Sequence, residues 1–428
     1  MGFNLENMGR GLLGMAFLFG ICYLLSNNRK AINWKLVGLG VIAQIAFALG
    51  VLSQGRFNIF RILIQWFSEK FVELINLGHK GIEFMFGNLA DSSGSWAYVF
   101  AVQALPNIIF FAALSSLLYY LGILQKVVHF FAILLSKLRI SGAESVSTAG
   151  NIFLGQTEAP LLIRPFLDKM NRSEMLCIMV GGMANTAGSV LGAYVGFLGG
   201  SDPVQQKFFA LHLLSQSIMS APAAIVCSKI LFPQTEKVDT KVQVSREKLG
   251  DNVLDAISLG TTDGLKLAVN VGAMLIVFTA LMYVLNWILG SLGYHLGLNE
   301  PIRQITGGRY DGLSFQMLLG YIFSPVAWMI GVDGKDMVQV GQLLGEKTII
   351  NEFQAYITFG AMKTAGAISD PKSILITTYA LCGFANFASI GIQIGGISQL
   401  APNQRKNLTE LGVKALIGGT IACLMCAC

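Results

Sequence analysis

Charged side chains are scarce in this chain of 428 residues. Asp, Glu, Lys and Arg together make up 13% of the sequence, whereas a soluble domain carries about 25%. Apolar residues make up 54%, and the mean hydropathy is +0.61. These values exclude an ordinary water-soluble protein and predict a chain that crosses a membrane several times.

Histidine and cysteine are too few and too scattered to predict a metal centre. Cys423, Cys426 and Cys428 come nearest to a metal-binding spacing, but no histidine or second cysteine pair completes it. The other cysteines lie in or beside apolar segments, where a thiol is a small apolar side chain. No run of basic residues is interleaved with aromatics, so we expect no nucleic-acid partner.

Long uncharged runs predict the spanning helices. Residues 11–28 and 36–55 predict two spans, and the basic residues between them outnumber Arg10 before the first. The positive-inside rule therefore places that loop in the cytoplasm and the N-terminus outside. The run 92–125 predicts one long or tilted helix, with Pro106 as a candidate kink. Further spans are expected at 208–228 and 267–294, an interfacial or re-entrant piece at 313–332, and a final run at 411–428 that is short for a crossing.

Residues 57–77 have a different pattern. Polar residues, among them Arg61, Glu69 and Glu73, recur every three or four positions between large apolar ones. This period predicts an amphipathic helix that is too charged to span the membrane. We expect it to lie in the plane of the membrane interface.

Two further segments mix polar and apolar residues too closely to be simple spans. Residues 141–169 hold Asn151, Gln156 and Glu158, and residues 336–362 hold Asn351 and Glu352. We interpret each segment as a re-entrant hairpin, because non-helical backbone is tolerated in a membrane only where protein or water covers it. A charged residue at that depth is costly and is a functional-site hypothesis.

One motif occurs in each half of the chain. Gly182-Met-Ala-Asn185 follows the first hairpin, and Gly383-Phe-Ala-Asn386 follows the second. An internal repeat whose copies each hold a broken polar segment is typical of a transporter site at mid-membrane. With a cytoplasmic linker at 233–252 and one span after it, the second hairpin enters from outside. The two repeats are therefore predicted to be inverted.

The polar tips suggest a class of substrate. Ends of half-helices expose backbone groups that can bind polar atoms or a cation. Two glutamates, Glu158 and Glu352, argue against an anionic substrate and favour a neutral polyol-like or cationic one, with a coupling cation or proton nearby. For any single residue, cross-linking of the hairpins is an equally good interpretation, although for both glutamates together it is a weaker one. A membrane hydrolase would need a nucleophile and a base, but no histidine lies near a polar tip and no paired-aspartate motif is present, so we expect no enzyme. A continuous channel is also less well supported, because two glutamates in broken repeats favour a site that occludes its substrate.

Three stretches resemble the signatures of concentrative nucleoside transporters in their bacterial short form. They are residues 155–160 (Gly-Gln-Thr-Glu-Ala-Pro), 351–353 (Asn-Glu-Phe) and 383–386 (Gly-Phe-Ala-Asn). The similarity runs over nearly the whole chain. It implies about eight spanning helices, an interfacial helix and two re-entrant hairpins in an inner-membrane homotrimer with both termini outside. It also implies sodium-coupled import of nucleosides such as uridine by an elevator mechanism. Proton coupling, or another neutral hydroxylated solute, stays open.

The resemblance also implies a nucleoside site drawn from both repeats. The first hairpin would contact the nucleobase and the second hairpin the ribose. The implied residues are Gln156, Thr157 and Val190 at the base, Glu352, Asn386 and Ser389 at the ribose, and Phe384 and, through water, Glu158 as helpers.

A sodium ion is implied between the first hairpin and the broken helix that follows it. Its ligands would be the Asn151 side chain and the carbonyl groups of Leu154, Asn185 and Thr186. The chain departs from the expected pattern at Asn185, where sodium-coupled relatives usually have serine. Because the implied ligand is a backbone carbonyl, this change need not abolish sodium binding, and it leaves proton coupling open.

The expected division of the chain follows from these segments. It comprises two N-terminal helices (1–56), the interfacial helix (57–91), a scaffold helix (92–140), the first hairpin and broken helix (141–232), the linker (233–252), a second scaffold helix (253–312), and the second hairpin and broken helix with the last helix (313–428).

Overall fold

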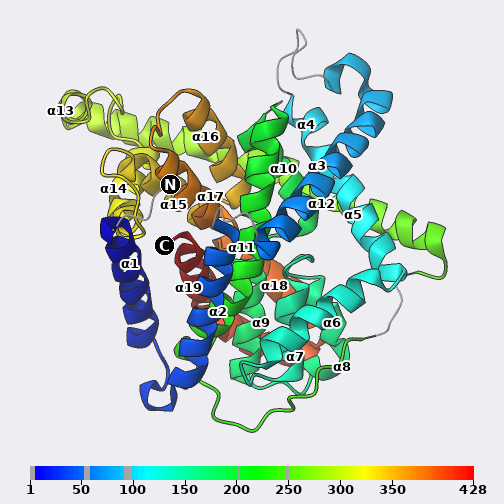
Figure 1. The fold of residues 1–428 in the computed structure, drawn as a ribbon. Coiled ribbons are helices and arrows are strands. Elements are labelled where there is room, and N and C mark those ends of the chain that lie inside the picture. Colours follow the sequence, from blue (N-terminus) through cyan, green and yellow to red (C-terminus); the bar gives the residue numbers. More distant parts are fainter. Residues whose placement is uncertain (1–4, 53–57, 91–98, 201, 246–249) are drawn as a thin grey trace.

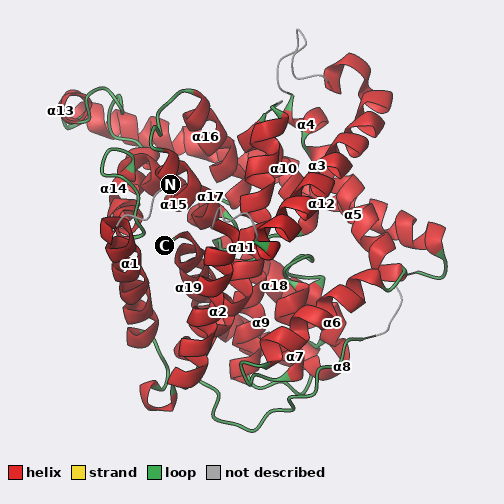
Figure 2. Cartoon of the chain, viewed as in Figure 1, coloured by secondary structure: helices red, strands yellow, loops and turns green. Residues whose placement is uncertain are grey.

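The computed structural model describes residues 5–52, 58–90, 99–200, 202–245 and 250–428. Within these ranges the chain is helical and has no β-strand, as Figure 2 shows, which confirms the predicted all-α class. In the same ranges, 6 helices are long and apolar enough to cross a membrane, judged by length and composition. The expected number of about eight spans stays a prediction.

The three N-terminal helices each pack against α11 (Pro203–Leu231). They are α1 (Leu5–Leu24), α2 (Trp34–Leu52) and α3 (Ile59–Phe86). Gly40 lets α2 approach α11 closely, because a Cβ there would lie 2.4 Å from a methyl group of Val226. The amphipathic pattern does form a helix, and Asn58 caps its start by accepting from the Arg61 N–H. Apolar side chains such as Trp66 and Phe67 are exposed on it, as an interfacial helix requires.

The prediction of a single scaffold helix at 92–140 is wrong. The described part of this segment holds three helices: α4 (Phe100–Gln103), α5 (Leu105–Tyr120) and α6 (Ile123–Ser136). Gly122 lies between α5 and α6 with φ +73°, a left-handed conformation that glycine adopts without steric cost and that ends the helix. Pro106 does not kink a helix but stands in the first turn of α5, where its missing N–H is not needed.

Both predicted hairpins and both broken helices are present. Hairpin 1 consists of α7 (Gly142–Gly150), η3 (Ala159–Ile163) and α8 (Arg164–Leu167), and hairpin 2 consists of α15 (Met337–Ile349) and α16 (Glu352–Thr364). Figure 1 places hairpin 1 near the bottom of the molecule and hairpin 2 near the top. The broken helices are α9 (Arg172–Ala184) with α10 (Gly188–Gly199), and α17 (Pro371–Leu381) with α18 (Phe387–Leu400).

An unbroken helix completes each repeat, α11 in the first and α19 (Arg405–Ala427) in the second. The expectation that the last run is short for a crossing is wrong, because α19 has 23 residues. Its charged first turns are accommodated by neighbours: Glu410 forms an ion pair with Arg172 (2.7 Å), and the Lys414 ammonium lies 6.0 Å from the Phe232 ring centroid.

Helices α12 (Val253–His295), α13 (Asn299–Ile305) and α14 (Phe315–Met329) connect the repeats. The predicted span at 267–294 is therefore only part of α12, which starts within the charged residues that precede it. Gly260 and Gly264 bring α12 against α5, since a Cβ at either position would lie within 2.9 Å of α5 atoms. Helix α14 has only 15 residues, in keeping with the short piece expected at 313–332.

The linker lies along the base of hairpin 1. The Gly142 N–H donates to the Asp239 carbonyl (2.8 Å), and the Ser245 N–H donates to the Leu162 carbonyl (2.9 Å). A Cβ at Gly142 would overlap the Lys241 carbonyl, so only glycine fits there. Arg246 and Lys248 of the predicted linker, the first residue of the predicted interfacial helix and the start of the run at 92 lie outside the described residues.

Candidate functional site

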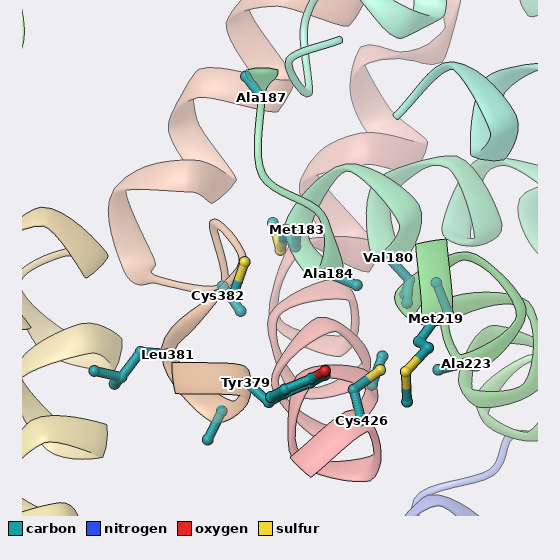
Figure 3. Packing of buried hydrophobic residues seen from close by; sticks show 14 of the residues in the cluster. Val180, Met183, Ala184, Ala187, Met219, Ala223, Tyr379, Leu381, Cys382 and Cys426 are labelled. Carbon is teal, nitrogen blue, oxygen red and sulfur yellow. The ribbon is translucent and has the colours of Figure 1, made fainter. Parts of the chain in front are cut away.

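The two helix breaks face each other in the middle of the molecule. Figure 3 shows Met183 and Ala184, at the end of α9, close to Cys382 in the other break. The Gln216 amide on α11 donates to the carbonyls of Ala184 (3.3 Å) and Cys382 (2.8 Å). The Cys423 thiol on α19 donates to the same two carbonyls, at 3.5 and 3.1 Å. One side chain from each unbroken helix thus donates to one open carbonyl of each break.

The two motif asparagines do not occupy equivalent places, although the sequence repeat aligns them. Asn185 ends α9, where its amide donates to the Gly181 carbonyl (3.1 Å) and accepts from Ser220 (2.5 Å). Asn386 begins α18, where its side chain accepts from the Ser389 N–H (2.9 Å). The sequence match is therefore out of register with the structural repeat.

Hairpin 2 reaches the start of α18 through Glu352. This residue opens α16, and its carboxylate accepts from the Asn386 amide (2.7 Å) and from the Tyr194 hydroxyl on α10 (3.3 Å). Tyr194 is fixed by stacking on Tyr356, with ring centroids 4.3 Å apart. The structure thus brings together two of the residues assigned to the ribose, Glu352 and Asn386.

Hairpin 1 reaches the same turn of α18 from the other side. The Gln156 amide donates to the Ser389 hydroxyl (3.1 Å), while its carbonyl oxygen is buried and has no hydrogen-bond partner among the described residues. Thr157 is half-buried and faces α18, because a Cβ at Gly396 would lie 2.6 Å from its methyl group. A residue assigned to the base and one assigned to the ribose are therefore neighbours.

Glu158 has a more local role in this conformation. Its carboxylate accepts from the Gly155 N–H (3.1 Å) and so closes the turn at the tip of its own hairpin. The side chain is half-buried and makes no hydrogen bond with Glu352, Asn386 or Ser389 in the described part of the chain. Its assignment to the ribose through water stays a prediction.

The residues assigned to sodium surround the end of α9. Asn151 follows α7, is 1% exposed, and neither atom of its amide has a partner among the described residues. The Asn185 carbonyl accepts from the Phe384 N–H (3.3 Å), and a carbonyl oxygen has a second lone pair to offer. Leu154 and Thr186 are buried, and the Thr186 hydroxyl contacts the Cys382 sulfur (3.1 Å). The Asn185 side chain bonds to Gly181 and Ser220. Asparagine in place of the serine usual in sodium-coupled relatives therefore does not occupy the second lone pair of the backbone carbonyl.

The remaining predicted residues lie close by in the chain. Val190 is buried in the first turn of α10, and Phe384 is half-buried in the second break. Gly383 beside it has φ +133°, and a Cβ there would lie 2.6 Å from the Cys423 sulfur. The second break therefore depends on a glycine.

Sequence reasoning missed three buried side chains that organise the site. Tyr194 follows Val190 by four residues, and Gln393 follows Asn386 by seven, so helical periodicity places each on the face already nominated. The Gln393 amide donates to the Met179 carbonyl (3.0 Å) and joins α18 to α9. Gln216 lies in a long apolar helix outside any motif, and nothing in the sequence indicates that it bridges the two breaks.

A surface hollow lies elsewhere, between α12 and α14. Asn286, Asn299, Tyr310 and Gln342 are among its lining residues. None of the nominated site residues lines it. The candidate site is instead a buried junction, in which Ser389, Asn386, Glu352 and Gln156 are 1%, 3%, 4% and 8% exposed.

The sequence matches three family models along most of its length. Residues 13–89 match the N-terminal model of the Na⁺-dependent nucleoside transporters, and residues 101–201 match a model described as nucleoside recognition. Residues 212–428, half of the chain, match the C-terminal model of the same transporters. The chain belongs to the Na⁺-dependent, concentrative nucleoside transporter family. This confirms the resemblance seen in the sequence, the membrane location, and sodium as the coupling ion of the family.

Relatives support this membership over nearly the full chain. An uncharacterized transporter of Haemophilus influenzae is 41% identical over 423 residues, which cover 97% of this chain and 95% of the relative. Sodium/nucleoside cotransporter 1 of Rattus norvegicus is 37% identical over 431 residues, which cover 96% of this chain and 62% of the longer rat protein.

Solved structures of the transporter CNTnw share the fold. Its inward-facing, substrate-bound state has a TM-score of 0.86 and 37% identity, covering 98% of this chain and 97% of that one. An outward-facing state of a double variant has a TM-score of 0.88 and 36% identity, covering 99% and 97%. The same fold is therefore compatible with both an inward-facing and an outward-facing state.

Proposed function

We propose that this transporter imports nucleosides by symport with sodium. The observation that carries the proposal is the convergence of both hairpins on one helix turn. Gln156 of hairpin 1 contacts Ser389, and Glu352 of hairpin 2 contacts Asn386, at the first turn of α18. A ligand held there touches both repeats at once.

The second hairpin supplies the chemistry for a ribose. A carboxylate has about four lone-pair sites, and Glu352 uses two of them on Asn386 and Tyr194. The other two can accept hydrogen bonds from a pair of neighbouring sugar hydroxyls. Asn386 and Ser389 can each donate and accept, which matches a hydroxyl that does both.

The first hairpin supplies the chemistry for a nucleobase. The Gln156 carbonyl oxygen is buried without a partner in the described residues, so it is available to an N–H donor of a base. Thr157 adds a hydroxyl beside it, and Val190 adds an apolar surface on α10. Several base edges satisfy this set, so both purine and pyrimidine nucleosides fit.

The sodium part of the proposal rests on Asn151. A buried amide without partners is costly, and an ion is one of the explanations for such a group. The amide oxygen, with the carbonyls of Leu154, Asn185 and Thr186, supplies the all-oxygen set that a hard cation prefers. The cation would also balance the carboxylate of Glu158 on the same hairpin.

We further propose an elevator movement in a homotrimer of the inner membrane, with both termini outside and no catalytic step. Support comes from three side chains: Gln156 links hairpin 1 to α18, Gln216 links α11 to both breaks, and Gln393 links α18 to α9. These hydrogen bonds favour movement of the linked elements as one body. The α5–α12 pair is the candidate scaffold. Large apolar side chains of α12, such as Ile276 and Trp287, are exposed and available to lipid or neighbouring subunits.

The test is uptake of labelled uridine into proteoliposomes under imposed gradients. An inward sodium gradient at equal pH should drive accumulation above the equilibrium level, and excess unlabelled uridine should abolish it. A proton gradient without sodium is the second arm. Uptake in that arm alone would replace sodium by proton coupling, and no uptake in either arm would refute nucleoside symport. Glu352→Gln, reconstituted at the same density, is the control for leak.

A further inference from the structure

Lys347 is a buried cation that the proposed mechanism does not use. It lies in the last turn of α15, on the first arm of hairpin 2, and is 2% exposed. Its ammonium donates to the Ala380 carbonyl in the last turn of α17 (2.9 Å). In the described part of the chain, no carboxylate oxygen lies within the 4.0 Å of an ion pair with it. A buried charge without a direct counter-ion calls for a partner of another kind.

Two neighbouring carboxylates have other hydrogen-bond partners. Glu346 precedes Lys347 on α15 and accepts from the Gln342 amide (2.8 Å). Glu352 accepts from Asn386 and Tyr194. The ammonium therefore donates to a carbonyl at the end of a half-helix rather than to a carboxylate. The C-terminal end of a helix carries partial negative charge, which favours a cation there.

The end of α9 in the other repeat differs at this point. Its carbonyls receive only neutral donors from the described residues: the Asn185 amide, the Gln216 amide, the Cys423 thiol and the Phe384 N–H. The residue that approaches it from the first arm of its hairpin is Asn151, whose amide has no hydrogen-bond partner among the described residues. One half-helix end thus meets a fixed ammonium, and the other meets an unpaired amide suited to a free ion.

We propose that the Lys347 ammonium is a tethered cation that does at the end of α17 what sodium does at the end of α9. The inference rests on the sodium symport proposed above. An ammonium is a compact point charge with three donors, so it can stand in for a small cation among carbonyl groups. The Lys347 ammonium then serves as the positive charge that balances Glu352 within hairpin 2. Only repeat 1 needs to bind an ion from solution.

The experiment compares neutral variants of Lys347 in sodium titrations. Lys347→Gln keeps a donor but removes the charge, and Lys347→Met removes both. Purified protein is titrated with NaCl, with choline chloride keeping the ionic strength constant, and both uridine binding and the thermal midpoint are recorded. We expect a Hill coefficient of about 1 for wild type and a value approaching 2 for either variant, with roughly tenfold more sodium needed for half-saturation.

Lys363→Met is the matched control. Lys363 lies on the second arm of hairpin 2 and donates to the Leu198 carbonyl near the end of α10 (2.7 Å), but it is only half-buried. Water can replace it, so its loss should leave the sodium curve unchanged. Lys347→Arg should restore a Hill coefficient of about 1, because it keeps the charge.

The outcomes separate this inference from the sodium proposal. A flat wild-type curve would refute sodium coupling itself. A sodium-dependent wild type with superimposable Lys347→Gln and Lys347→Met curves would refute only the tethered cation. If both variants unfold in choline and are recovered by sodium, the inference holds. If neither folds even at molar sodium, Lys347 is a structural contact that no free cation replaces, and the inference fails.

Discussion

Hairpin 1 with α9 and α10, and hairpin 2 with α17 and α18, follow the same order of elements but differ where the first half-helix ends. Helix α9 has 13 residues and closes on Asn185, whereas α17 has 11 residues and closes on Cys382. The asparagine of the second repeat falls across the break, where it begins α18 instead. One shared motif thus ends a helix in one repeat and starts a helix in the other.

Because of this difference, the two motif asparagines have different hydrogen-bond partners in the two repeats. In repeat 1, the Asn185 side chain bonds to Gly181 of its own helix and to Ser220 of α11, and its backbone carbonyl is a proposed sodium ligand. In repeat 2, the Asn386 amide donates to the Glu352 carboxylate, and both side chains belong to the proposed ribose site. In the proposed mechanism, a shift of a few residues in a broken helix therefore distinguishes an ion site from a substrate site.

The largest expected effect is a loss of stability when the glycine of the second break is replaced. Gly383→Ala introduces a side chain at φ +133° and within 2.7 Å of the Cys423 sulfur and the Ala184 carbonyl. Backbone strain of about 1–3 kcal/mol and overpacking of about 1–3 kcal/mol should together lower the free energy of unfolding by about 2–6 kcal/mol. The measurement is the unfolding midpoint of purified protein.

The aligned Gly182 is the matched comparison. It lies inside α9, where alanine is favoured, but a Cβ would lie 2.6 Å from the Gln393 amide and 2.9 Å from the Gln156 side chain. Gly182→Ala should therefore weaken uridine binding more than it lowers the unfolding midpoint. Equal midpoints for both variants would mean that the second break has no special conformation.

The next effect compares the two glutamates. Glu352→Gln removes charge-assisted hydrogen bonds, each worth about 1.5–3 kcal/mol, so uridine affinity should fall roughly 10–100-fold while the fold persists. Glu158→Gln keeps an acceptor for the Gly155 N–H and should cost less than tenfold. Isothermal titration at saturating sodium measures both. A larger loss from Glu158→Gln would reverse the assignment.

A smaller expected effect distinguishes sodium binding from nucleoside binding. Asn151→Ala should raise the sodium concentration for half-maximal uptake by roughly tenfold, because one oxygen ligand is lost. Uridine affinity at saturating sodium should change little. Asn107→Ala is the control, since Asn107 is also buried and has an unpartnered amide oxygen but lies on α5. The same sodium shift in both variants would mean that any buried asparagine has this effect.

The smallest expected effect concerns the link between the repeats. Gln393→Ala removes the hydrogen bond from α18 to the Met179 carbonyl, worth about 0.5–1.5 kcal/mol. Uridine affinity should fall by less than about tenfold, and the sodium dependence should be unchanged. Sodium titrations of uridine binding measure both quantities, and a changed Hill coefficient would show that Gln393 also acts on the ion.

Much of the architecture was predictable because membrane chains have few ways to hide polar backbone. Uncharged runs indicated the spans, and polar tips in apolar surroundings indicated both hairpins. The 92–125 run misled because lack of charge says nothing about where a helix ends. Helix α4 ends at Gln103, and the left-handed Gly122 separates α5 from α6. Helix α19 was underestimated because its charged first turns are stabilised by Arg172 and Phe232, which are distant in sequence.

By itself, the sequence determined the class, the internal repeat and the identity of the polar residues, because hydropathy and motif spacing are local properties. The tertiary structure decided what those residues do. It brought Gln156 to Ser389, left the Asn151 amide without a partner among the described residues, and put Asn185 and Asn386 on opposite sides of their breaks. The reason is that a half-helix end acquires its ligand from whichever helix packs against it, and packing partners such as Gln216 and Lys347 lie outside the motif.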